Sequence, residues 1–121
     1  MTGSVLTAAY LHAWLRAFAF TQIVEVPIYR RMLGVSYGRA FTASAITHPV
    51  VWFVFPSVGS ALGVGYLGYA ILAELFAWLV EAFYFARVAR IPLRRSLLVS
   101  LCANAASVAL ALIGRSLFGA P

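Results

Sequence analysis

Three glutamates are the only acidic residues in this chain of 121 residues, and each lies inside a long apolar stretch. Glu25 and Glu81 stand 56 residues apart, whereas Glu74 precedes Glu81 by seven residues, which places those two on one helix face. A charged side chain inside a membrane costs about 2.5–3.5 kcal/mol, so such residues mostly face the interior of a helix bundle and serve a function. The placement of these acids therefore indicates a buried site.

Other polar residues fall near the depth of Glu25 and Glu81. Counted from turns near residues 34–35 and 90–91, both glutamates lie about 14 Å along their helices, and His48 and Asn104 lie about 20 Å along the returning helices. Helical side chains lean toward the N-terminus of their helix, so the two levels should converge. We expect a polar layer of Glu25, Ser44, His48, Glu81, Ser100 and Asn104, with Glu74 about 10 Å further from the turns.

Two carboxylates and an imidazole can pass protons and can also bind a divalent cation. We expect ion or proton binding at this layer, with the serine hydroxyls and the asparagine amide as neutral ligands. We predict no cofactor; the alternative is a divalent metal on Glu25, His48 and Glu81, although the chain has no HxxxH or ExxH pair. A third interpretation is a purely structural contact between helices, but interhelical hydrogen bonds in membranes average only about 0.6 kcal/mol.

Arg16 is a basic residue inside the first apolar stretch. It precedes Glu25 by nine residues and so lies on the opposite face of that helix, at a depth within about two residues of Glu74. We expect either a buried Arg16–Glu74 ion pair or an arginine that reaches the outer headgroups or a partner chain.

The composition is that of a membrane protein. Hydrophobic residues make up 64% of the chain and charged residues 10%, whereas a soluble domain is about half apolar and a quarter charged. These values exclude a disordered chain and disfavour a soluble enzyme. The single cysteine, Cys102, excludes an internal disulfide and a cysteine-based zinc finger.

Four stretches are long and apolar enough to cross a bilayer, which takes about 20 residues per helix. The short connections between them contain glycine and proline, as turns do. We predict an all-α fold with four transmembrane helices in a single transmembrane domain, residues 1–121. The predicted helices are residues 5–29, 37–55, 62–85 and 93–117, and the connections are residues 30–36, 56–61 and 86–92.

The arginines predict the orientation of these helices. Seven of the nine basic residues flank the first and third connections, so by the positive-inside rule this side is cytoplasmic and both termini face outward from the plasma (inner) membrane. The N-terminus lacks a signal peptide's features, so we expect Met1 onward to be retained. The net charge of +6 then reflects topology and anionic headgroups rather than nucleic acid. The topology-setting residues are Arg30, Arg31, Arg39, Arg87, Arg90, Arg94 and Arg95.

The chain also matches itself at an offset of 56 residues, with nine identities across positions 10–48. We expect two tandem helical hairpins, residues 5–55 and 62–117, which share one orientation and are related by a pseudo-twofold axis along the membrane normal. The polar identities are Glu25 with Glu81, Arg31 with Arg87, Arg39 with Arg95, and Ser44 with Ser100.

These features favour a small transporter- or channel-like protein for a cation or proton. Because four helices barely enclose a pathway, we expect a homo-oligomer or a larger membrane complex in the lipid bilayer. Enzyme signatures such as GxSxG, HExxH and CxxC are absent, so an enzyme is not favoured. The alternatives are a non-catalytic accessory or assembly subunit, and an intramembrane metal-binding or lipid-modifying enzyme.

Overall fold

The computed structural model describes residues 7–118, and all regular structure in this range is helical. The predicted all-α class is therefore confirmed for these residues. The first two residues of the predicted span 5–29, the expectation about Met1 and both chain ends lie outside the described residues. The five helices are α1 (Ala8–Leu33), α2 (Tyr37–Phe53), α3 (Phe55–Leu62), α4 (Tyr66–Val88) and α5 (Leu93–Phe118).

The turn between α1 and α2 is shorter than predicted. α1 continues through Arg30 and Arg31, since arginine is a good helix former and its charge favours the C-terminal end of a helix. Gly34 then adopts the left-handed conformation (φ 70°), which glycine adopts at little cost. The Ser36 side chain accepts a hydrogen bond from the Arg39 amide (3.2 Å) and so caps the start of α2.

Residues 56–61 were predicted as a loop, and this prediction is wrong because they belong to α3. α3 follows α2 directly, and the two helices are bent by 45°. Pro56 lies in the first turn of α3, where its missing amide hydrogen is not needed, and Gly63 (φ 70°) ends the helix. The turn is therefore residues 63–65, and the next helix begins at Tyr66 rather than at residue 62.

Two of the helices, α4 and α5, are long and apolar enough to cross a membrane, and the bent pair α2–α3 meets the same test if it counts as one span. α1 is not among them, although its 26 residues would extend about 39 Å. Its polar residues, which include Arg16, Gln22 and Glu25, lower its mean hydropathy. The predicted membrane character is thus supported by two or three helices, and not by all four predicted spans.

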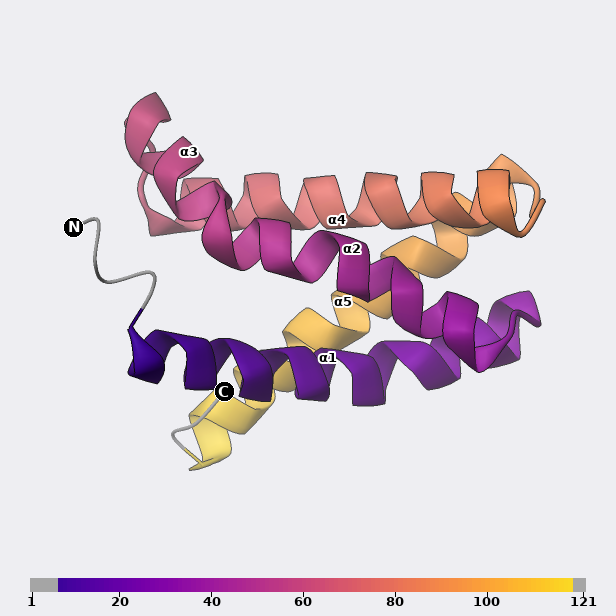
Figure 1. Ribbon diagram of the computed structural model, residues 1–121, viewed down its shortest axis with the longest axis horizontal. Helices are drawn as coiled ribbons and strands as arrows, with labels where there is room; N and C mark the ends of the chain where they lie inside the picture. Colours follow the sequence, from indigo (N-terminus) through magenta and orange to yellow (C-terminus); the bar gives the residue numbers. More distant parts are fainter. Residues whose placement is uncertain (1–6, 119–121) are drawn as a thin grey trace.

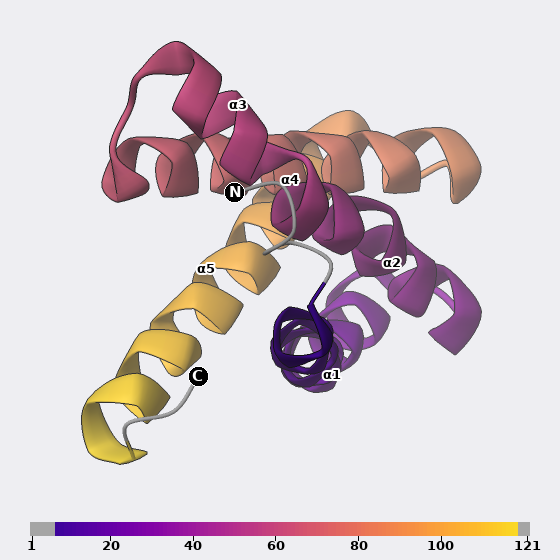
Figure 2. The ribbon, with the colours of Figure 1, turned by 60° about the vertical axis from the view of Figure 1, so that its left-hand side comes forward.

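The four long helices form a ring in which α1 and α4 lie diagonally opposite. α1 packs on α2 and α5, and α4 packs on the same two helices, while α3 packs on α2 and α4. Both short turns, 34–36 and 89–92, lie at the right-hand end in Figure 1. Towards its C-terminal half α5 diverges from α4 (Figures 1 and 2). The bundle is therefore closed at the turns and spread at the other end.

We call the end with the two turns the arginine end and the opposite end the terminal end. The seven arginines predicted to set the topology all belong to the arginine end, and all are exposed. Arg30 packs over the Tyr37 ring, 3.8 Å from its centroid. Arg95 donates a hydrogen bond to the Met32 carbonyl (2.7 Å), which joins α5 to the C-terminal end of α1.

The starts of two helices at the arginine end are 56 residues apart. α2 begins at Tyr37 and α5 at Leu93. Gly34 and Arg90, again 56 residues apart, both have positive φ angles, of 70° and 57°. Each of the two turns therefore contains one residue with a positive φ angle, a glycine in the first and an arginine in the other.

A side-chain contact recurs at the same offset. Gln22 donates from Nε2 to the Phe41 carbonyl (3.1 Å), and Trp78 donates from Nε1 to the Leu97 carbonyl (2.8 Å). The first bond joins α1 to α2 and the second joins α4 to α5. An amide and an indole therefore make corresponding contacts, although their side chains are not identical.

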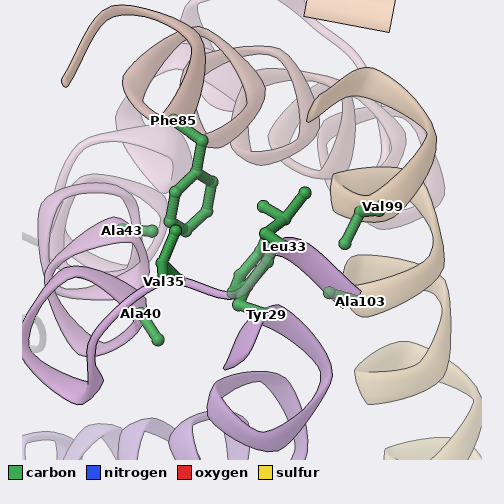
Figure 3. Packing of buried hydrophobic residues seen from close by; sticks show 8 residues of the cluster. All are labelled: Tyr29, Leu33, Val35, Ala40, Ala43, Phe85, Val99 and Ala103. Atoms are coloured by element: carbon green, nitrogen blue, oxygen red, sulfur yellow. The ribbon is translucent and has the colours of Figure 1, made fainter. Parts of the chain in front are cut away.

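Buried apolar side chains collect near the arginine end (Figure 3). Tyr29 and Phe85, which also differ by 56 in number, are both fully buried, and their ring centroids lie 4.5 Å apart. This pair contributes about 0.5–1.5 kcal/mol beyond its buried area. The smaller members of the cluster are Leu33, Val35, Ala40, Ala43, Val99 and Ala103.

Candidate functional site

The Glu25 carboxylate on α1 lies at the centre of the bundle and is 1% exposed. Its Oε1 accepts a hydrogen bond from Ser44 Oγ on α2 (2.7 Å), and its Oε2 accepts one from Ser107 Oγ on α5 (2.8 Å). Both neighbours of α1 in the ring therefore contribute a hydroxyl group to Glu25.

The Glu81 carboxylate on α4 faces Glu25 across the ring and is 2% exposed. Its Oε2 accepts a hydrogen bond from Thr47 Oγ1 on α2 (2.6 Å). Its Oε1 accepts hydrogen bonds from the Tyr29 hydroxyl on α1 and from Asn104 Nδ2 on α5 (3.2 Å). Each of the other three long helices thus donates to Glu81.

The two carboxyl groups are neighbours in the buried centre of the bundle and interact electrostatically with each other. Two negative charges this deeply buried repel each other, so their proximity favours a proton on one of the two groups. Neither glutamate forms an ion pair with a basic residue in the described chain. We call Glu25 and Glu81 the carboxyl pair; its arrangement fits a site that holds an exchangeable proton.

Ser100 supports the donors of this network. Its hydroxyl group donates to the Trp78 carbonyl (2.9 Å) and lies 3.3 Å from both the Tyr29 hydroxyl and Asn104 Nδ2. The structure thus brings together five members of the predicted layer: Glu25, Ser44, Glu81, Ser100 and Asn104.

His48 was predicted to join this layer, but the structure places it elsewhere. Its Nε2 lies 3.3 Å from Thr21 Oγ1, and its ring packs against Trp14, Phe18 and Trp52 at centroid distances of 6.5, 5.4 and 6.1 Å. The physical reason is the helix period: neighbouring residues point about 100° apart, and Thr47 takes the direction toward Glu81.

The expected buried ion pair between Arg16 and Glu74 does not form, and both side chains are exposed. Arg16 lies on the face of α1 that points away from Glu25, and α1 and α4 are not neighbours in the ring. Glu74 lies on the same face of α4 as Glu81, nearer the terminal end, and interacts electrostatically with Glu25.

The described residues contain no group of three or more His, Cys, Asp or Glu side chains placed to hold a metal ion. His48 lies away from Glu25 and Glu81, so one ligand of the metal site considered above is not at that site. The remaining carboxylate oxygens of the pair already accept hydrogen bonds from hydroxyl and amide groups.

Three residues of the network were absent from the predicted layer. Thr47 and Ser107 share helix faces with Ser44 and Asn104 by their spacing of three residues, so that spacing was an available signal. Tyr29 lies one helical turn from Glu25, toward the arginine end, and its apolar sequence neighbours indicate a core residue rather than a member of the polar layer. Only the packing of Tyr29 on Phe85 shows that its hydroxyl group reaches across the ring to Glu81.

Comparisons of the chain with protein-family models, with curated proteins and with solved structures give no match.

Proposed function

We propose that this chain is a small membrane protein that moves protons across the plasma (inner) membrane through the carboxyl pair. The observation that carries this proposal is the pair of buried carboxyl groups at the centre of the bundle, whose hydrogen-bond donors are all neutral side chains. Charged residues inside a membrane protein typically mark ion and proton pathways. A pair that shares a proton can accept or release one without leaving an isolated buried charge.

A proton suits this site better than a larger cation. Five hydroxyl, phenol or amide groups donate to the four carboxylate oxygens, so a cation would have to displace these donors. Divalent ions bind through six or more oxygen ligands, or through histidine and cysteine. The network instead stabilises carboxyl groups that gain and lose a proton in place.

The proposal includes four spans, with α1 and the bent pair α2–α3 as the two additional ones. Residues 5–55 and 62–117 would be two copies of one hairpin, which the recurring turns and the Gln22 and Trp78 hydrogen bonds support. The exposed arginines would hold the arginine end in the cytoplasm, with both termini outside. A homo-oligomer would enclose the pathway on the sides that four helices alone leave facing lipid.

Proton flux into liposomes tests this function. The purified chain is reconstituted with an internal pH-sensitive dye, and a potassium diffusion potential drives proton uptake. We expect uptake by the native chain, and uptake at the level of protein-free liposomes for the double variant Glu25→Gln, Glu81→Gln. Tyr84→Phe, which alters a half-buried tyrosine outside the network, is the matched control and should retain uptake. Absence of uptake by the native chain, or unchanged uptake in the double variant, would contradict the proposal.

A second candidate function is an accessory subunit of a larger membrane complex. Arg16 favours it, because this exposed arginine lies inside α1 on the face away from the carboxyl pair, where a partner chain could supply an acidic residue. Purification of the tagged chain from its native membrane in mild detergent distinguishes the two functions. A partner of constant stoichiometry that is lost in Arg16→Gln would favour the accessory role.

A further inference from the structure

The carboxyl pair is closed toward the arginine end. Tyr29 and Phe85 fill the centre of the bundle on the side of the pair that faces the arginine end, and both are fully buried. Beside them, Ala40 and Ala43 on α2 are also fully buried, and Figure 3 shows these side chains in one cluster with the Tyr29 ring. Ser96 is buried at this end as well, but its hydroxyl group has no hydrogen-bond partner, so it does not link the pair to the turns.

The opposite side of the pair carries polar side chains, one of which is exposed. Glu74 lies on the Glu81 face of α4, about 10 Å closer to the terminal end, and is exposed. Ser107 donates its hydroxyl hydrogen to Glu25. Ser107 and Glu74 are equally far from the turn at residues 89–92, about 25 Å along their helices. Gln22 lies one turn from Glu25 in the same direction and adds a buried polar side chain, whose amide nitrogen donates to the Phe41 carbonyl.

From this asymmetry we infer that the carboxyl pair exchanges protons only with the terminal end in this conformation. Glu74 is the residue that passes the proton, and Tyr29 with Phe85 is the barrier on the other side. The inference rests on the proposed proton site and assigns its direction of access. Glu74 is exposed, and α5 diverges from α4 toward the terminal end (Figure 2).

The transfer itself conserves charge and atoms. The Glu74 carboxyl group releases its proton, and an oxygen of the carboxyl pair forms the new O–H bond, with water and the Ser107 hydroxyl group as relays between them. Glu74 is then a carboxylate and takes up a proton from water at the terminal end. The electrostatic interaction of Glu74 with Glu25 couples the two steps, because a negative charge on one of these carboxyl groups disfavours a negative charge on the other.

Cysteine accessibility tests the direction of access without requiring transport. In a background in which the exposed Cys102 is replaced by alanine, Ser107→Cys reports on the terminal side of the pair and Ala43→Cys on the arginine side. A small membrane-impermeant thiol reagent is added to vesicles of either orientation. Ser60→Cys and Met32→Cys, both at exposed positions, calibrate the two sides.

We expect Ser107→Cys to react from the same side as Ser60→Cys, and Ala43→Cys to react from neither side until the protein is denatured. Reaction of Ala43→Cys from the side of Met32→Cys, or failure of Ser107→Cys to react while Ser60→Cys does, overturns the inference. Labelling in the expected pattern without proton uptake would leave the access route standing and reject the transport function, so the two failures are distinct.

A second variant keeps the inference testable if the cysteine variants do not fold. Glu74→Gln leaves every hydrogen bond of the carboxyl pair in place, because no hydrogen bond joins Glu74 to the pair. We expect proton uptake driven from the terminal side to fall about a hundredfold, the lower end of what a positioned acid–base group contributes. Uptake within twofold of the native rate, with uptake still abolished in Glu25→Gln, Glu81→Gln, overturns the role of Glu74.

Discussion

Replacement of Tyr29 by phenylalanine removes one hydroxyl group from the centre of the protein and leaves the buried ring in place. The hydroxyl group contacts both Glu81 and Ser100, but it has a single hydrogen. Ser100 already donates its own hydrogen to the Trp78 carbonyl, so the loss amounts to one hydrogen bond to the Glu81 carboxyl group. Glu81 Oε1 keeps the bond from Asn104 (3.2 Å) and is therefore not left without a donor.

The expected cost follows from that count. Hydrogen bonds to charged groups contribute about 1.5–3 kcal/mol in soluble proteins, whereas interhelical bonds in a membrane protein average about 0.6 and reach about 1.7 kcal/mol. We expect Tyr29→Phe to lower the free energy of unfolding by about 1–1.5 kcal/mol, between these ranges. Equilibrium unfolding by SDS in mixed micelles, followed by circular dichroism, measures this difference.

Tyr84→Phe is the matched control, since it removes a hydroxyl group from a half-buried tyrosine whose ring also packs on Phe85. Its free energy of unfolding should stay within about 0.5 kcal/mol of the native value. Equal destabilisation by the two substitutions, or none by Tyr29→Phe, would refute the assignment of the Tyr29 hydroxyl group to the carboxyl network.

The backbone yields two further predictions, measured by the same unfolding experiment. Gly34→Ala should lower the free energy of unfolding by about 1–2 kcal/mol because φ is +70°. Arg90→Gly, at φ 57°, should raise it by about 0.5 kcal/mol because the relief of left-handed strain exceeds the added entropy of glycine. A change of the same sign in both variants would contradict the proposed strain. Gly59→Ala should cost about 1–3 kcal/mol because its Cβ would lie 2.7 Å from Tyr69 Cβ. Gly38→Ala is the control and should cost nothing, because its Cβ would make only an ordinary contact, 3.9 Å from Ser36 Oγ. A neutral Gly59→Ala would mean that α3 does not pack closely on α4.

Much of the fold was predictable because few physical rules govern it. Apolar stretches separated by glycine and proline gave the helical class and the start of α5 at Leu93, as the structure has it. The length of the first turn was not predictable from hydropathy, since Arg30 and Arg31 read as polar but continue a helix. α3 was missed because Pro56 was read as a loop residue rather than as the first turn of a helix that ends at Gly63.

The carboxyl pair was predictable from the rarity and depth of its residues, and from the lean of helical side chains toward the N-terminus. That lean explains why Glu81 meets Asn104, which lies further along its helix from the turn. The choice between Thr47 and His48 was not predictable, because a rotation of one residue about the helix axis decides which of them faces the centre. The reach of Tyr29 depends on the packing of non-adjacent helices, which no local pattern contains.

The central claim is that Glu25 and Glu81 hold an exchangeable proton inside the bundle. Infrared spectroscopy of the reconstituted protein tests it directly, since a protonated carboxyl group has a carbonyl stretching band that a carboxylate lacks, and this band shifts in D₂O. We predict such a band in Glu74→Gln, in which Glu25 and Glu81 are the only acidic side chains left, and its loss in the triple variant Glu25→Gln, Glu74→Gln, Glu81→Gln. A Glu74→Gln protein without the band, or a band that survives in the triple variant, would contradict the proton-sharing pair.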